Sequence, residues 1–175
     1  MEIDELDRKI LQSVQKDFSP SIEHLADLVG LSRNAVWRRL KSLEQNGYII
    51  KKVALLDPDK LGVGLLVFIQ IRTNQHDPEW RQRFASAIKR FPQIISAHRM
   101  TGDLDYLIKA RVGNMTEYDA LYQSLTEKVP LSDVSASFVM EHLKDTTELP
   151  LEDARHLNAL ISPVTRRLIQ QEHTW

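Results

Sequence analysis

Apolar residues in the first third of the chain recur at intervals of three and four positions, the spacing of amphipathic helices. The first stripe predicts a helix over about 4–16 with Asp4 as its cap, and it consists of Ile3, Leu6, Ile10, Leu11 and Val14. Residues that start and stop helices bound two more, the second beginning after Ser21 and the third after Ser32. The residues from 48 to 56 then favour a two-stranded wing.

The second and third of these helices, joined by a turn that holds Gly30, have the order of a helix-turn-helix, in which the later helix enters the major groove of DNA. The whole chain has a formal net charge of −1, whereas residues 28–52 carry six basic side chains and one acidic side chain, a local charge of +5. Because Lys and Arg neutralise phosphates, this concentration of positive charge predicts a double-stranded DNA operator as the partner.

Side chains off the buried stripe of the third helix, with the two lysines that follow it, are the predicted DNA contacts. They are Ser32, Arg33, Asn34, Trp37, Arg38, Arg39, Lys41, Lys51 and Lys52. Asn34 and the arginines can read base edges. The contacts expected on phosphates are Ser32, Arg39, Lys41, Lys51 and Lys52. The alternative is a solvated basic helix on a three-helix packing unit.

Residues 57–62 have the composition of a domain linker, so we expect a first domain over 1–56 and a second over 63–150. The pattern after the linker predicts a strand over 65–72, a helix over 78–91, strands over 94–101 and 106–112 joined by a hairpin at 102–105, a helix from Asn114 to near Pro130, and a strand over 134–144. This β-α-β-β-α-β order is the ferredoxin-like arrangement, an α+β fold with four antiparallel strands and both helices on one face.

One face of this sheet has no helix to cover it. Phe68 lies on the opposite face of the first strand from Val67 and Ile69, so both faces carry apolar side chains. An uncovered face of this kind usually pairs with a partner sheet, and the sequence therefore predicts a homodimer. The last residues, 151–175, are predicted to form a helical extension.

Composition excludes several classes of protein. Hydrophobic residues make up 42% and charged residues 27%, which is typical of a globular chain, and the absence of cysteine excludes disulfides and thiol nucleophiles. The histidines lack metal-ligand spacing and no Walker A, GxSxG or GxGxxG motif occurs, so we expect no enzyme, no metal and no cofactor. No apolar run is long enough to cross a membrane and the acidic first residues are unlike a signal peptide, so a cytoplasmic protein is expected.

Two other classes stay open at this point. A small enzyme built on paired ferredoxin-like sheets would leave the +5 segment unexplained. An architectural DNA-compacting protein without effector control fits the DNA-binding half equally well, and only a response to a ligand separates it from a regulator.

Four segments together resemble the Lrp/AsnC family of prokaryotic transcription factors over about residues 3–150. They are LDRKILQSVQKD, LADLVGLSRNAVWRRLKSLEQNGYIIKKVALLDPDKLG, RMTGDLDYLIKARV and FVMEHLKDTTELPL. The resemblance implies a helix-turn-helix followed by an amino-acid-binding ferredoxin-like domain, with dimers formed through the sheets and often assembled into octamers. KVALLDP, DPEWRQRF and SDVSASFVMEHLK are most similar to a branch tied to cysteine catabolism.

The resemblance also implies an effector pocket where the glycine hairpin meets a neighbouring dimer. The matching residues are Met100, Thr101, Gly102, Asp105 and Tyr106, with Ser135 and Ser137 on the last strand. Asp105 can accept the ammonium of an amino acid, and backbone N–H groups around Gly102 can donate to its carboxylate. Ala136 stands where many relatives carry threonine, so a different ligand, a lost ligand or a plain hairpin with solvated aspartates stay as alternatives.

Overall fold

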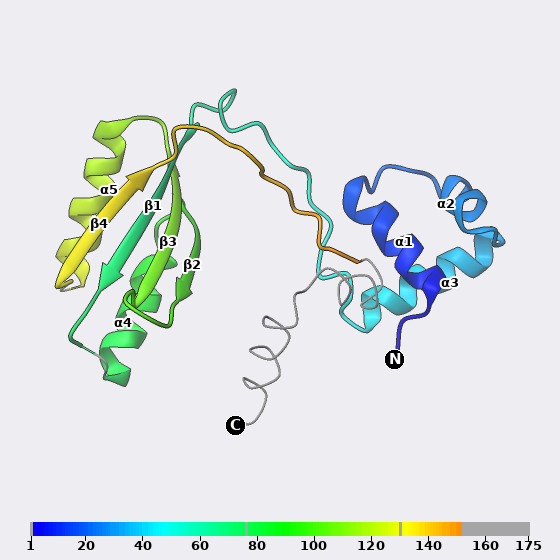
Figure 1. Cartoon of the computed structure of the whole chain (residues 1–175), viewed down its shortest axis with the longest axis horizontal. Helices are drawn as coiled ribbons and strands as arrows, with labels where there is room; N and C mark the ends of the chain where they lie inside the picture. The colour runs from blue at the N-terminus through cyan, green and yellow to red at the C-terminus, as the bar shows by residue number, and fades with distance from the viewer. Residues whose placement is uncertain (1, 76, 130, 152–175) are drawn as a thin grey trace, which may run out of the picture. The chain divides into compact units, whose positions relative to one another are not determined.

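Short capped helices build the N-terminal part of the chain in the computed structural model, which describes residues 2–75, 77–129 and 131–151 (Figure 1). They are α1 (Glu5–Lys16), α2 (Ile22–Val29) and α3 (Arg33–Gln45). The predicted caps are confirmed, because the side chains of Asp4, Ser21 and Ser32 each accept a hydrogen bond from a backbone N–H of the first turn. Gly30 ends α2 with φ +66°, a conformation that favours glycine.

A small apolar core holds these helices together. Ile10 of α1, Leu25 of α2 and Val36 and Leu43 of α3 are almost completely buried in it. The two strands predicted over 48–56 do not form in the described chain, which has no strand between α3 and residue 65. The physical reason is that the described chain offers this segment no pairing strand: Ile49 packs against the helical core, whereas its neighbour Ile50 is 91% exposed.

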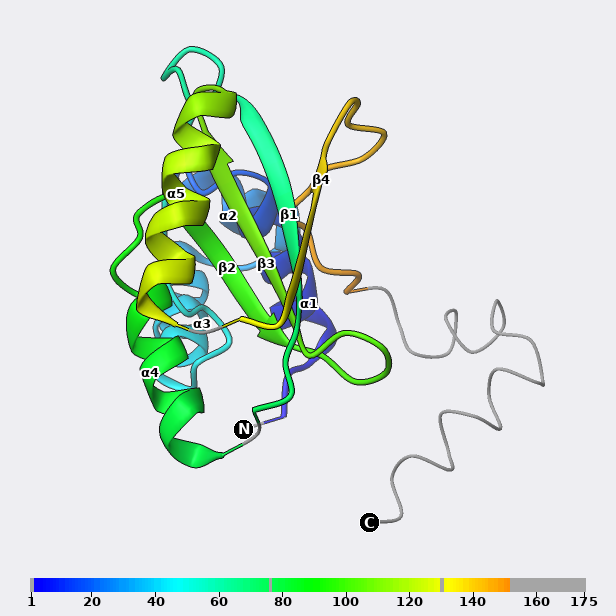
Figure 2. The ribbon, with the colours of Figure 1, turned by 90° about the vertical axis from the view of Figure 1, so that its left-hand side faces the viewer.

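The second part of the chain forms the predicted ferredoxin-like fold. Its elements are β1 (Leu65–Arg72), α4 (Pro78–Ile88), β2 (Ile94–Arg99), β3 (Tyr106–Val112), α5 (Met115–Lys128) and β4 (Asp133–Phe138). The described strands make one four-stranded sheet in the order β2-β3-β1-β4, with antiparallel neighbours throughout. Both helices cover the same face of this sheet (Figure 2), which confirms the α+β architecture.

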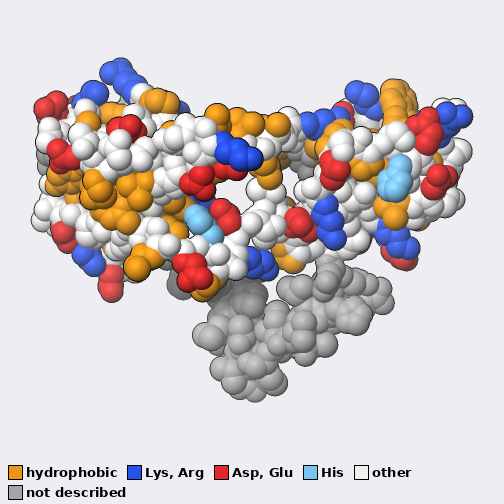
Figure 3. Space-filling view, turned by 90° about the horizontal axis from the view of Figure 1, so that it is seen from above, with side chains coloured by type: hydrophobic (Ala, Val, Ile, Leu, Met, Phe, Trp, Pro, Cys, Tyr) orange, Lys and Arg blue, Asp and Glu red, His pale blue; other side chains and the backbone are white. Residues whose placement is uncertain are grey.

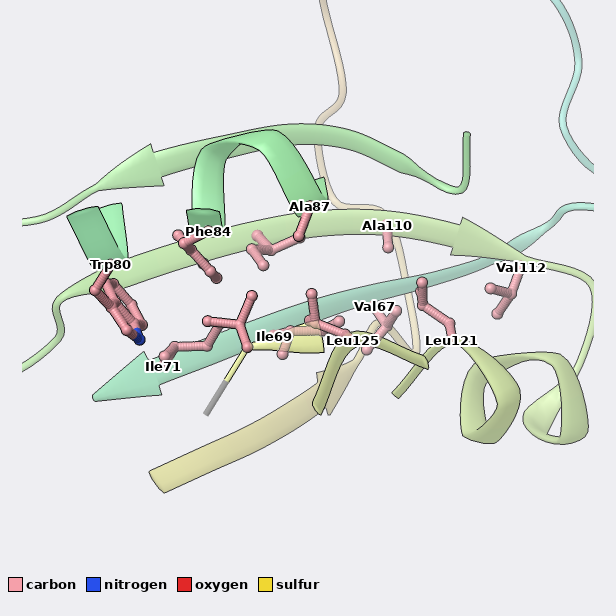
Figure 4. Close-up of a cluster of buried hydrophobic side chains, with 12 residues drawn as sticks. Val67, Ile69, Ile71, Trp80, Phe84, Ala87, Ala110, Val112, Leu121 and Leu125 are labelled. Atoms are coloured by element: carbon pink, nitrogen blue, oxygen red, sulfur yellow. The ribbon is translucent and has the colours of Figure 1, made fainter. Parts of the chain in front are cut away.

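The core of this unit lies between that face and the two helices (Figure 4). Val67, Ile69 and Ile71 of β1 point into it and are fully buried. Residues that alternate with them, such as Phe68 and Gln70, lie on the other face, which no helix of the described chain covers. We call this the open face; it is the surface on which the expected homodimer depends.

Two predicted elements end three or more residues earlier than expected. The last strand was expected to reach residue 144, but β4 stops at Phe138 because β1, its partner, begins at Leu65 and offers only one more bond, from Val139 N–H to the Leu66 carbonyl at 3.0 Å. The helix expected to reach residue 91 ends at Ile88, since Pro92 disfavours helical backbone just before it.

The chain divides into two compact units, the first made of residues 2–54 and 145–151 and the second of residues 55–144. Residues 145–150 were expected in the second domain, whereas they leave the sheet and contact the first unit. Leu151 packs against the core of that unit. The helical extension expected for 151–175 lies, apart from Leu151, outside the described residues.

An ion-pair cluster ties α3 to the start of α1. Arg39 donates to carboxylate oxygens of Asp4 and Asp7, both at 2.7 Å, and the Asp7 side chain is only 6% exposed. The hydrogen bond from the Asp7 backbone N–H and the guanidinium of Arg39 hold the pKa of Asp4 below its ordinary value of 3.8. The cluster therefore fixes the position of α3 electrostatically as well as by packing.

We expect Arg39→Met to lower the free energy of unfolding by about 1–3 kcal/mol, because the nearly buried Asp7 carboxylate loses its cation. The control Arg38→Met removes an exposed arginine of the same helix and should change stability by less than about 0.5 kcal/mol. Urea unfolding measures both.

The same cluster sets a pH dependence. The contribution of Asp4 is present above its ordinary pKa of 3.8 and is lost as the pH falls below it. Arg39→Met should therefore show a shallower loss of stability between about pH 4 and pH 2 than the parent. Equal slopes would show that Arg39 does not contribute to this pH dependence.

Candidate DNA-binding face and effector site

One side of α3 is buried and the opposite side is exposed. Val36, Leu40 and Leu43 face the core. The exposed side carries Asn34, Trp37, Arg38, Lys41 and Gln45, which we call the α3 face. From Asn34 the positions pass to Trp37 and Arg38, then to Lys41 and to Gln45, in steps of three or four residues, so they line one stripe along the helix. Donors and acceptors that can meet base edges are thus presented along the whole length of the helix.

Gln45 is the member of the α3 face that sequence analysis missed. It is exposed and lies one turn beyond Lys41. A glutamine amide can pair with adenine in the same bidentate manner as asparagine. The signal was present in the helical spacing, but counting charges does not detect a neutral residue.

The basic residues differ in how far they are already paired. Within the described ranges, Arg38 and Lys51 form no ion pair, so both cations are available to a ligand. Arg33 pairs with Glu23 at 2.8 Å, but both side chains are more than half exposed. An exposed pair of this kind is worth at most about 1 kcal/mol, so a phosphate can compete for Arg33.

Glu44 forms ion pairs with the other two lysines of this segment. It pairs with Lys52 at 2.5 Å and with Lys41 at 3.5 Å, and the hydrogen bond from Lys52 is the largest cause that holds the pKa of Glu44 below its ordinary value. Lys52 also lies 4.2 Å from the ring centre of Phe18.

Three of the predicted contacts have a role inside the fold. Arg39 is held by Asp4 and Asp7, as described above, and the Ser32 hydroxyl caps α3 by accepting from the Ala35 N–H at 3.3 Å. Trp37, 51% exposed, borders a cavity of about 260 Å³ between the helices of this unit. Arg39 is the charged residue among these three, and its guanidinium is paired with two carboxylates of the fold.

The predicted effector hairpin lies at one end of the sheet and is fastened there by Asp105. Its carboxylate accepts from the Thr73 N–H at 2.8 Å, and its own N–H donates to the Ile71 carbonyl at 3.1 Å. The Met100 N–H closes the turn by donating to the Asp105 carbonyl at 2.8 Å. Gly102 has φ +91°, which favours glycine. Asp105 is thus a structural residue of the hairpin, whatever else it binds.

Arg72 and Asp133 were not predicted, yet they complete this end of the sheet. The Arg72 guanidinium donates to the Asp103 carbonyl at 2.9 Å and to the Asp133 carboxylate at 2.8 Å. It therefore connects the hairpin, β1 and β4. The only sequence signal for it was a cation at the end of an otherwise apolar strand.

The predicted effector residues are not all brought together. The ring of Tyr106 points to the helix side of the sheet, 4.6 Å from the ring centre of Phe84. Ser135 and Ser137 alternate with core-facing residues of β4 and lie on the open face, and Gln70 donates to the Ser137 hydroxyl at 3.4 Å. Residues 100–105 form one cluster, whereas Tyr106 and the two serines lie on opposite faces.

The described part of the chain contains no cluster of three or more His, Asp or Glu side chains that could hold a metal ion. Nor does any described helix combine the length and apolar character needed to cross a bilayer.

A helix-turn-helix with a polar, partly cationic exposed face, followed in sequence by a ferredoxin-like unit, defines a class of DNA-binding transcriptional regulators with a ligand-binding domain. The chain belongs to the Lrp/AsnC family. Residues 66–149 match the model of the Lrp/AsnC ligand binding domain, and residues 3–50 match a winged helix-turn-helix DNA-binding model. The family assignment made from the sequence is confirmed.

Several relatives match over almost their whole length. The DNA-binding transcriptional activator DecR of Escherichia coli K12 is 45% identical over 151 residues, which cover 86% of this chain and 99% of that protein. A glutamate uptake regulatory protein of Zymomonas mobilis is 44% identical, with 86% and 92% covered. The leucine-responsive regulatory protein of Escherichia coli K12 is 35% identical, with 86% and 93% covered.

Solved structures agree with this assignment. An AsnC family transcriptional regulator from Agrobacterium tumefaciens superposes with a TM-score of 0.83 at 44% identity, covering 86% of this chain and 98% of that one. The regulator NMB0573 of Neisseria meningitidis, solved as a complex with L-Met, has a TM-score of 0.83 at 32% identity, covering 89% and 99%.

Proposed function

We propose that this regulator reads its operator with the α3 face and that an amino acid bound near the 100–105 hairpin modulates the reading. The observation that carries the first half is the set of exposed polar side chains on α3, backed by Arg38 and Lys51, which form no ion pair with any residue that the structure describes. Base-edge contacts are assigned to Asn34, Arg38 and Gln45, and phosphate contacts to Lys41 and Lys51. Arg33 and Lys52 are also assigned to phosphates, which replace the carboxylates of Glu23 and Glu44 as their partners on DNA.

The second half of the proposal concerns the effector. A structural neighbour at 32% identity is solved with L-Met, which makes L-methionine the first probe for this chain. L-cysteine follows from the resemblance to the cysteine-catabolism branch. The site proposed is the hairpin with Asp105 as ammonium acceptor. The place of action proposed is the cytoplasm, and the proposed assembly is a homodimer that can associate further into octamers.

The DNA face is tested by alanine variants with different roles. Arg38→Ala and Gln45→Ala should each cost about 1–3 kcal/mol on the operator and change base preference, because they remove base contacts. Lys51→Ala should weaken binding to every sequence and reduce the salt slope by about one. Lys89→Ala removes the same charge from the other unit and should have no effect. Titrations on selected and random duplexes at several salt concentrations measure this, and variants that bind like the parent would refute the assignment.

The homodimer is tested on the open face. Phe68→Lys should yield monomers in light scattering, because it puts a charge on the surface that pairs with a second copy. Met115→Lys replaces an exposed apolar residue at the start of α5, on the covered side of the sheet, and should leave the dimer intact. Footprints of the parent should show half-sites one helical turn, about 34 Å, or a multiple of it apart. A monomeric parent would contradict the proposal.

The effector site is tested with a change that spares the fold. Asp105→Asn removes the negative charge while its amide oxygen can still accept from the Thr73 N–H. It should abolish the thermal shift given by L-methionine or L-cysteine and leave basal DNA binding intact, because a charge-assisted hydrogen bond is worth about 1.5–3 kcal/mol.

Asp103→Asn is the matched control in the same hairpin. Its carboxylate accepts no hydrogen bond from the described residues, and it should keep the shift. A shift that survives Asp105→Asn would place the ligand elsewhere. A parent that binds DNA but shows no shift with any proteinogenic amino acid would favour the architectural alternative.

A further inference from the structure

Residues 145–151, which follow the last strand of the ligand-binding unit, belong structurally to the DNA-binding unit. We call them the strap. The side-chain amide of Gln15 on α1 holds the strap at Leu149, where its Nε2 donates to the carbonyl at 3.0 Å and its Oε1 accepts from the N–H at 2.9 Å. Two residues further on, Leu151 packs against the helical core.

These two hydrogen bonds are specific, because the donor and the acceptor of the Gln15 side-chain amide are both used, and they pair with the backbone C=O and N–H of the single residue Leu149. A side chain thereby replaces the neighbouring strand that an extended segment would otherwise need. A slip of the strap by one residue would break both bonds and would displace Leu151 from the apolar core. Its docking on α1 therefore has a fixed register.

The strap changes how the two units are connected. The ligand-binding unit is joined to the DNA-binding unit through the chain at residues 54–55, and again at residues 144–145. A single flexible connection limits only the distance between two bodies. A second attachment with a fixed register also limits their relative rotation.

We propose that the strap is a second tether that restrains each helix-turn-helix relative to its ligand-binding unit, with Gln15 as its latch. The inference rests on the proposed function, in which a dimer reads two half-sites. Restraint lowers the entropy that must be lost when the second helix-turn-helix of a dimer engages its half-site. It has no such effect on the binding of one helix-turn-helix to a single half-site, since Gln15 lies outside the α3 face.

The test uses the full chain with Gln15→Ala, Gln15→Glu and the control Gln12→Ala. Gln12 lies on the same helix, and its side chain makes no hydrogen bond within the described residues. Hydrogen exchange at the Leu149 amide should be slow in the parent and in Gln12→Ala, and fast in Gln15→Ala. Gln15→Glu keeps the acceptor but loses the donor to the Leu149 carbonyl, so exchange there should be intermediate or fast.

Operator titrations then separate restraint from simple structural support. Gln15→Ala should weaken binding to a duplex with two half-sites by about three- to tenfold and leave binding to a single half-site unchanged. Leu151→Ala removes the apolar contact between the strap and the helical core, and it should also weaken binding to the duplex with two half-sites. Equal loss on both duplexes, or an unchanged Leu149 exchange rate in Gln15→Ala, would overturn the tether.

Failure of the proposed function gives a different result. A parent with no preference for two half-sites over one would contradict paired reading by a dimer. The exchange rate at Leu149 would still decide whether Gln15 latches the strap. Slow exchange that depends on Gln15, with no difference between the two duplexes in any variant, would refute the restraint while keeping the contact.

Discussion

The position of α3 depends on one charged contact. Arg39 sits on the edge of α3 between its buried and exposed sides, and its guanidinium is satisfied by two carboxylates at the start of α1. An arginine at this position without partners would point along the surface and add its charge to the DNA face. Because Asp4 and Asp7 bind its guanidinium, Arg39 anchors the helix and does not add its charge to the α3 face. The charge of +5 read from the sequence therefore overstates the charge available to DNA.

The helices and strands were predictable because their signals are local. Capping residues and apolar periodicity lie within a few positions of the elements that they define, and α1, α2 and β1 begin and end close to where the pattern placed them. The failures concern contacts between distant positions. The wing needed a pairing strand that the described chain does not supply, and β4 could extend only as far as its neighbour. Arg39 meets residues 32 and 35 positions away, which no periodicity indicates.

The effector hairpin shows a similar limit. The sequence placed Asp105 in a ligand pocket through resemblance, while the structure shows that one of its oxygens already fixes the hairpin to the end of β1. The two roles are compatible, because a carboxylate can accept several hydrogen bonds through its two oxygens. A ligand ammonium would meet an acceptor whose direction is set in advance by Thr73. Preorganisation of this kind lowers the entropic cost of binding.

The two units have separate apolar cores. No single core therefore links the ligand-binding unit to the DNA-binding unit. Coupling between an effector and an operator amounts to about 1–3 kcal/mol, the size of a few hydrogen bonds. Connections along the chain can carry a free energy of that size if they have a defined geometry. The linker after α3 has exposed apolar side chains (Figure 3) and no strand pairing, so it has little fixed geometry of its own. The second connection, through residues 145–151, does have a fixed register, because this segment is hydrogen-bonded to Gln15 of α1. A change at the carboxyl end of β4 would reach the DNA-binding unit most directly along that path.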